Sequence, residues 1–158
     1  MDAQILDLCA GTGNISFEFV SRGAASVLAI DSHPRCVQYL KQNTQTLQIA
    51  SVMQVYKSDC VIYCKNAKNV QYDIIFADPP FHLGFHEELI AQIFDKNLLR
   101  PDGYLIIEHG KQDDFSQEAH FDICRNFGNV YFSFFKPTVW NAVYSQEVLT
   151  PLPKDTKL

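Results

Sequence analysis

The sequence predicts an α/β fold of the Rossmann-like class, with three layers (αβα) built around a mostly parallel sheet of about seven strands. Two observations support this prediction. Short apolar runs alternate with longer segments of helical spacing, which is the pattern of βα units stacked on a parallel sheet. Towards the C-terminus, two strand-like runs flank Gly128 and Asn129, which is typical of an antiparallel hairpin at the edge of the sheet.

The expected elements follow one another in this order. Strands are expected at residues 4–8, 26–30, 52–56, 72–77 and 104–108, with helices between them at residues 14–21, 34–47, 60–65 and 87–97. Gly23 follows the first helix and Pro34 stands in the first turn of the second, as helix ends require. The Arg-Pro-Asp-Gly run at residues 100–103 predicts a turn, and residues 121–127 and 131–136 predict the hairpin.

Length and composition predict one domain. A chain of 158 residues that is 47% apolar can bury a single sizeable core, which we expect at residues 1–136, followed by a C-terminal tail at residues 137–158. No apolar run approaches the roughly 20 residues of a membrane span, and the first ten residues lack a signal-peptide pattern. We therefore expect a cytoplasmic protein with no membrane partner. The five cysteines form no CxxC pair, so no metal site is expected.

The charge balance limits the partners. The formal net charge is -5, and the 13 lysines and arginines are scattered along the chain. General affinity for phosphate backbones needs clustered basic residues, so this composition argues against it. An RNA substrate would require a few local contacts, or basic residues supplied by another part of the protein or of a complex.

A glycine-rich segment, Asp7-Leu-Cys-Ala-Gly-Thr-Gly13, ends the first expected strand and opens the first helix. Glycines here let the backbone turn sharply and approach a ligand, while free N–H groups at the helix start face it. The segment predicts a cofactor loop, and an ordinary strand-to-helix turn is the alternative. Ser16 stands where a dinucleotide motif requires its third glycine. The loop residues predicted to bind the cofactor are Asp7, Ala10, Gly11, Thr12 and Gly13.

Two further carboxylates follow strands at the same edge of the expected sheet. Asp31 ends the second strand, where a carboxylate can accept hydrogen bonds from both ribose hydroxyls. Asp59 follows the third strand and could contact an adenine amino group. Each of them could instead cap the next helix. The neighbouring residues Ser32 and Cys60 complete the predicted cofactor set, together with Asp78.

The segment Asp78-Pro-Pro-Phe81 directly follows an apolar strand. Consecutive prolines fix the backbone, so the carbonyl groups of Asp78 and Pro79 would lie in a rigid turn at the carboxyl end of the sheet. Acceptors there could bind the two hydrogens of an aromatic amine and stabilise the positive charge that develops when its nitrogen attacks a methyl group. Phe81 would stack on the base. We predict Asp78, Pro79, Pro80 and Phe81 as catalytic residues, and an ordinary rigid loop is the alternative.

These motifs resemble those of a known family. The loop at residues 7–13 and the run at residues 78–81 are similar to the signatures of class I amino-methyltransferases that use S-adenosylmethionine. Glu18, the run at residues 21–24, the Glu108-His109 pair and the run at residues 127–129 resemble the RsmD family more closely. The resemblance implies methylation of the exocyclic amine (N2) of a guanine in small-subunit ribosomal RNA, without a metal. The acidic charge suggests that the RNA is recognised within an assembled or assembling particle.

The resemblance has two departures and leaves alternatives open. The family has a basic hairpin and a helix before the glycine loop, and here Asp7 stands near the start, so either the sequence is a shortened form or another segment takes over these roles. Phe81 stands where the family usually has tyrosine. The alternatives are a methyltransferase acting on adenine N6 of DNA or RNA, an inactive cofactor-binding remnant, and a nicotinamide-dependent oxidoreductase. Glu108 and His109 could contact substrate or simply cap the fifth strand.

Overall fold

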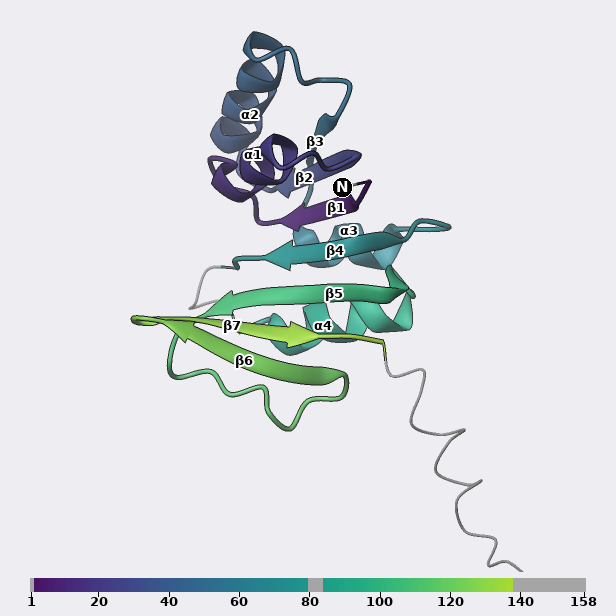
Figure 1. Ribbon diagram of the computed structural model, residues 1–158, viewed down its shortest axis with the longest axis vertical. Coiled ribbons are helices and arrows are strands. Elements are labelled where there is room, and N and C mark those ends of the chain that lie inside the picture. Colours follow the sequence, from purple (N-terminus) through teal and green to yellow (C-terminus); the bar gives the residue numbers. More distant parts are fainter. Residues whose placement is uncertain (1, 80–83, 138–158) are drawn as a thin grey trace, which may run out of the picture.

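The computed structural model describes residues 2–79 and 84–137, and within that part of the chain it has seven strands and four helices (Figure 1). The strands are β1 (Gln4–Leu8), β2 (Ser26–Asp31), β3 (Met53–Lys57), β4 (Tyr72–Ala77), β5 (Leu99–His109), β6 (Phe121–Phe127) and β7 (Val130–Phe135). The helices are α1 (Asn14–Ser21), α2 (Pro34–Thr46), α3 (Cys60–Asn66) and α4 (His86–Asp95). Of the expected C-terminal tail at residues 137–158, residues 138–158 lie outside the described part.

The strands form one mixed sheet in the order β3-β2-β1-β4-β5-β7-β6. The first five strands are parallel, while β7 runs antiparallel to β5 and β6 antiparallel to β7. The predicted mostly parallel sheet with a C-terminal hairpin is confirmed. The strand order reverses between β1 and β4, and ligands of open α/β sheets bind beyond the carboxyl ends of the strands at such a point.

The side chains of the sheet alternate between two apolar cores, as the period of a strand requires. Leu6 and Leu8 of β1 pack with the buried residues of α3 and α4. Ile5 of the same strand packs on the opposite face with Leu40 of α2 and with Phe17 of α1. The helices therefore cover both faces in the predicted three layers, with α1 and α2 on one side and α3 and α4 on the other (Figure 1).

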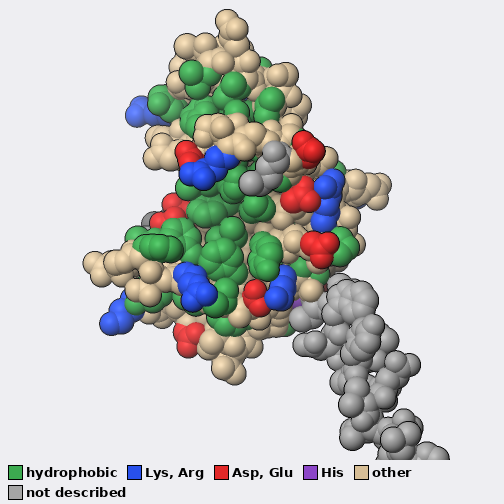
Figure 2. All heavy atoms as spheres, in the orientation of Figure 1, with side chains coloured by type: hydrophobic (Ala, Val, Ile, Leu, Met, Phe, Trp, Pro, Cys, Tyr) green, Lys and Arg blue, Asp and Glu red, His purple; other side chains and the backbone are tan. Residues whose placement is uncertain are grey.

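On the face of the sheet that carries α1 and α2, no helix of the described residues covers strands β4 to β7. Figure 2 shows apolar side chains gathered there and bordered by charged ones. A shallow hollow of about 350 Å³ lies on this face, and β4, β5, β6 and β7 line it with Ile74, Tyr104, Ile106, Ile123 and Phe134. Within the described residues no helix covers this area, because α1 and α2 pack over β1 to β3.

The turn predicted at residues 100–103 is wrong. These residues belong to β5, which begins at Leu99 and pairs with β4 through a bulge: Tyr72 lies opposite Leu99, and Ile74 lies opposite Tyr104. A Cβ on Gly103 would lie 3.0 Å from the backbone oxygens of Tyr72 and Asp73, so the strands approach closely here. Turn chemistry is local, whereas pairing with β4 lets the bulge absorb the proline and glycine without ending the strand.

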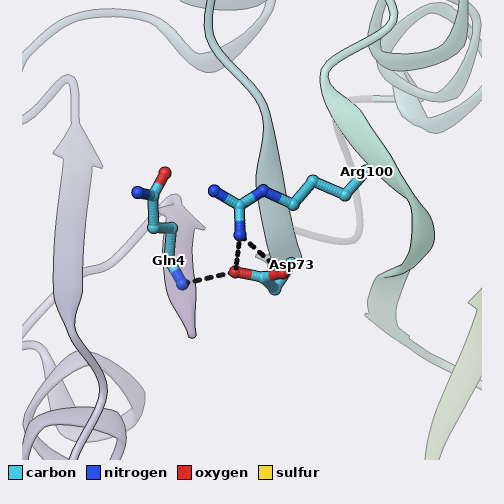
Figure 3. A network of polar contacts seen from close by, with 3 residues as sticks. All are labelled: Gln4, Asp73 and Arg100. Atoms are coloured by element: carbon cyan, nitrogen blue, oxygen red, sulfur yellow. Dashed lines mark hydrogen bonds and ion pairs between the residues drawn. The ribbon is translucent and has the colours of Figure 1, made fainter. Parts of the chain in front are cut away.

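A polar network fastens the amino ends of three strands beside this bulge (Figure 3). The Arg100 guanidinium of β5 donates to both carboxylate oxygens of Asp73 on β4, at 3.0 Å each. The backbone N–H of Gln4, at the start of β1, donates to the same carboxylate at 2.7 Å. The network holds β1, β4 and β5 together at the sheet edge opposite to the predicted site. None of the helices in the described ranges has the length and apolar character that crossing a membrane demands.

Candidate functional site

A cavity of about 500 Å³ lies at the carboxyl edge of the parallel strands. Six of the ten predicted cofactor residues line it: Gly11, Asp31, Ser32, Asp59, Cys60 and Asp78. Five further lining residues were not predicted from the sequence: Cys9, His33, Cys36, Ser58 and Phe85. Cys9, His33 and Ser58 each stand next to a predicted residue just after a strand, and that position is the signal that could have found them. Cys36 lies within α2 and Phe85 directly before α4, so no such signal marks these two.

A larger hollow of about 790 Å³ lies at the opposite edge, and Gln4, Ser26, Gln71 and Arg100 are among its lining residues. None of the predicted site residues lines it. Of its polar groups, the Arg100 guanidinium and the backbone N–H of Gln4 are hydrogen-bonded to Asp73 in the structural network described above. Because parallel sheets bind ligands at the carboxyl ends of their strands, the smaller cavity is the better candidate.

The glycine loop contributes Cys9 and Gly11 to the lining of this cavity, and Gly13 does not line it. Gly13 is the N-cap of α1, with φ 84°, and its lack of a side chain leaves the helix start without a side-chain cap. A Cβ on Gly13 would overlap the buried side chain of Leu40, so this glycine is also required for packing against α2. At Gly11, with φ 56°, a Cβ would meet nothing within 4 Å. Thr12 is exposed and Ala10 half-buried, and neither lines the cavity.

Asp31 joins the glycine loop to the end of β2. Its carboxylate accepts a hydrogen bond from the backbone N–H of Gly11 at 2.8 Å and one from that of His33 at 2.7 Å. The N-cap of α2 is His33, so Asp31 is not the helix cap that the sequence left open. Each carboxylate oxygen has two lone-pair directions, and Asp31 therefore keeps acceptor capacity towards the cavity.

Asp59 is the N-cap of α3, and its carboxylate accepts from the backbone N–H of Ile62 at 2.9 Å. The capping alternative is thus observed, and the same exposed side chain also lines the cavity. Cys60 begins the helix next to Cys9 of the glycine loop. The hydrogen bond from the Cys9 thiol lowers the pKa of Cys60, while the pKa of Cys9 itself is raised. Both cysteines line the cavity.

Asp7 is buried beneath the glycine loop and does not line the cavity. The hydroxyl of Ser16, also fully buried, donates to its carboxylate. The pKa of Asp7 is raised to about 7. Burial is the largest cause; the hydrogen bond from Ser16 lowers the pKa, and the nearby Asp78 and Asp31 raise it. The serine at the third position of the glycine pattern therefore has a structural reason, because it supplies a donor to a buried carboxyl group.

Asp78 and Pro79 directly follow β4, and Asp78 lines the cavity, whereas Pro79 does not. Asp78 is exposed and Pro79 buried, and partial burial raises the pKa of the Asp78 carboxyl. The backbone N–H of Asp78 approaches the carbonyl of Leu8 at 3.4 Å, which places this turn beside the start of the glycine loop. Pro80 and Phe81, the other two predicted catalytic residues, lie outside the described residues.

Two histidines near this edge are buried. The His109 ring hydrogen-bonds Ser133 at 2.8 Å and the Gly110 carbonyl at 2.9 Å, and it is 1% exposed. It therefore fastens β5 to β7 and cannot reach a substrate. His86, in the first turn of α4, is also buried, and burial lowers its pKa. Residues 2–79 and 84–137 contain no group of three or more His, Cys, Asp or Glu side chains suited to a metal ion.

Comparison with known proteins places the chain in a family. A family model described as conserved hypothetical protein 95 matches residues 1–136. The chain belongs to this family, the RsmD family. Ribosomal RNA small subunit methyltransferase D of Haemophilus influenzae is 32% identical over 111 residues, which are 69% of this chain and 58% of the relative. The protein of the same name from Escherichia coli is 32% identical over 68% of this chain and 54% of its own length.

A solved structure extends the match to the fold. The yhhF protein of Escherichia coli, for which a methyltransferase activity is inferred, superposes with a TM-score of 0.76 and 28% identity, covering 85% of this chain and 75% of that chain. The Rossmann-like methyltransferase fold predicted from the sequence is confirmed. The chain spans somewhat more than half of the length of the curated RsmD relatives that it matches.

Proposed function

We propose that the chain is an S-adenosylmethionine-dependent methyltransferase that methylates the exocyclic amine (N2) of a guanine in small-subunit ribosomal RNA. One observation carries the proposal. Asp78, which begins the Asp-Pro-Pro-Phe run, lines a cavity together with Asp31 and Asp59 at the carboxyl edge of the sheet. Membership of the RsmD family supports the choice of cofactor and substrate, since its curated relatives are named as methyltransferases of small-subunit ribosomal RNA.

The cavity suits a nucleoside cofactor. Its volume of about 500 Å³ lies within the range of small-molecule sites. Asp31 would accept hydrogen bonds from the ribose hydroxyls, and Asp59 one from the adenine amino group. Gly11 allows close approach, since a side chain there would project into open space. The buried Asp7 would act indirectly by supporting the glycine loop through Ser16.

The proposed methyl transfer depends on two hydrogen-bond acceptors, the Asp78 carboxylate and the Pro79 carbonyl. When bound, S-adenosylmethionine supplies an electrophilic methyl group on a sulfonium. Transfer of that group to the guanine nitrogen would leave the cofactor as its thioether, and the amine would give up one proton to solvent. The Asp78 carboxylate and the Pro79 carbonyl would accept hydrogen bonds from the amine, stabilising its developing positive charge. Holding both partners in line supplies much of the acceleration.

The RNA must present the guanine unpaired or flipped out of a helix, because its amine has to reach the Asp78 carboxylate and the Pro79 carbonyl. The net charge of -5 argues against strong binding to naked phosphate backbones, so we propose an assembled or assembling particle as the substrate. A cytoplasmic location follows from that partner.

Calorimetric titration tests the cofactor first. S-adenosylmethionine and S-adenosylhomocysteine should bind saturably, and NADH should not; binding of NADH alone would contradict the proposal. Methyl transfer to ribosomal RNA is then measured for Asp78→Ala. The control is Asp102→Asn, because Asp102 is an exposed carboxylate near the amino end of β5. We expect Asp78→Ala to lower the rate by roughly 100-fold or more. S-adenosylhomocysteine should still bind this variant, and an unchanged rate would remove Asp78 from the mechanism.

A further inference from the structure

Glu108 lies beside Asp78, which lines the cavity. The parallel pairing of β4 with β5 ends at Ala77 opposite Ile107, so the next two residues, Asp78 and Glu108, are neighbours across the strands. Ala77 and Ile107 are buried in the core beneath α3 and α4. Since strand side chains alternate, Asp78 and Glu108 both lie towards the other face of the sheet.

The charge of Asp78 acts on the Glu108 carboxyl group. Burial raises the pKa of Glu108, and the charge of Asp78 raises it further. Among the ion pairs of the described residues, none includes Glu108 or Asp78. A partly buried carboxylate such as Glu108, beside a second carboxylate and without a cation, is costly unless a donor satisfies it. A ligand that presents two adjacent N–H donors would satisfy both.

We propose that Glu108 determines the choice of base by accepting a hydrogen bond from N1–H of the target guanine, while Asp78 accepts one from its N2 amine. The inference rests on the proposed function and adds a residue that reads the base. Guanine carries N–H donors at both N1 and N2, which are adjacent on its Watson–Crick edge. Adenine and 2-aminopurine carry a lone pair at N1, which a carboxylate repels. Flipped bases are read by hydrogen bonds to this edge.

The test changes the group on each side of this contact, and because 2-aminopurine also lacks the O6 of guanine, the effect of Glu108→Gln on the preference isolates the contact at N1. The guanine that the wild-type protein methylates is first located by mass spectrometry, and the same RNA is then prepared with 2-aminopurine at that position. 2-Aminopurine keeps the reacting amine but accepts at N1. Glu108→Gln keeps the shape of the side chain and can donate to that atom. The quantity measured is the ratio of kcat/KM for guanine to kcat/KM for 2-aminopurine.

We expect the wild-type protein to favour guanine by roughly 100-fold or more, because a site built for a donor rejects its absence. Glu108→Gln should lower kcat/KM for guanine by about 10-fold, since a charge-assisted hydrogen bond becomes a neutral one. It should also raise kcat/KM for 2-aminopurine, so that the ratio falls by at least about 30-fold. A purely structural role of Glu108 would lower both values together.

The control is Asp102→Asn, the same carboxylate-to-amide exchange at the opposite end of β5, which should leave the ratio unchanged. A ratio in Glu108→Gln within about threefold of the wild-type value would overturn the assignment of Glu108. In that case wild-type methylation of guanine would still support the proposed function. Absence of guanine methylation by the wild-type protein would overturn the proposed function, and the role of Glu108 with it.

Discussion

The backbone N–H of Gly11 donates a hydrogen bond of 2.8 Å to Asp31, across an interval of 20 residues in the chain. This bond joins the glycine loop after β1 to the end of β2, and the second carboxylate oxygen of Asp31 accepts from His33. One side chain therefore shapes the loop and faces the cavity that the loop lines.

Asp31→Ala should weaken binding of S-adenosylhomocysteine by about 100-fold. The substitution removes charge-assisted hydrogen bonds to the ribose and releases the Gly11 N–H from its acceptor. Calorimetric titration measures the affinity, and a thermal melt confirms that the variant is folded. Affinity within threefold of wild type would exclude Asp31 from ribose binding, and the exposed Asp102→Asn serves as the control.

Substitutions of Asp59 separate its capping role from contact with adenine. Serine is as good an N-cap as aspartate, so Asp59→Ser should leave the free energy of unfolding within about 0.5 kcal/mol of wild type, whereas Asp59→Ala should lose about 1 kcal/mol. Both variants lack the carboxylate, so both should bind S-adenosylhomocysteine several-fold more weakly. If Asp59→Ser binds as the wild type does, Asp59 is a cap alone.

The buried Asp7 predicts a pH-dependent stability. Its pKa is raised from 3.8 to about 7 by burial, so between about pH 4 and pH 7 the folded protein holds a proton that the unfolded chain releases. The free energy of unfolding should therefore fall as the pH rises through this window, by on the order of 4 kcal/mol in total from this group. Urea unfolding at pH 5 and at pH 8 measures the change.

Asp7→Asn removes the titrating group and keeps a side chain of the same shape beside Ser16. Its loss of stability between pH 5 and pH 8 should be smaller than that of the wild type, and at pH 8 it should be the more stable protein. Asp102→Asn should retain the wild-type pH dependence, because its side chain is exposed. Equal pH dependence in Asp7→Asn and wild type would contradict the raised pKa.

Gly13→Ala and Gly11→Ala form a matched pair within one loop. Both glycines have positive φ, where a Cβ costs about 1–2 kcal/mol. At Gly13 the Cβ would also overlap Leu40, which is fully buried and has little room to move. Overpacking of this kind costs typically about 1–3 kcal/mol more. Denaturant unfolding should show the larger loss for Gly13→Ala, and equal losses would refute the packing role of Gly13.

Alkylation of cysteines offers a test of the cavity that needs no RNA. Cys36 lines the cavity and is half-buried, so an alkylating reagent can reach it, whereas Cys60 is buried. Saturating S-adenosylhomocysteine should therefore slow modification of Cys36 by iodoacetamide several-fold. Cys124 is exposed on β6, away from the cavity, and its rate should not change. Mass spectrometry of peptides follows each site, and unprotected Cys36 would place the cofactor elsewhere.

Much of the fold was predictable because its signals are local. The expected strands and helices agree with the observed ones to within two residues, apart from the start of β5. The glycine loop, Asp31 and Asp59 were predictable because each follows a strand whose carboxyl end lies at one edge of a parallel sheet. Strand periodicity, Gly and Pro act within a few residues, so a single sequence displays them.

Contacts between distant segments were decided only by the tertiary structure. The run at residues 100–103 has the composition of a turn, but pairing with β4 makes it part of β5. The sequence left open whether His109 contacts substrate. In the structure His109 is buried and hydrogen-bonded to Ser133 on β7, so it does not reach a substrate. The same strand order places Glu108 beside Asp78. The amino acids of a segment determine which local conformations it favours, whereas its partners depend on the packing of the whole sheet, which no single segment encodes.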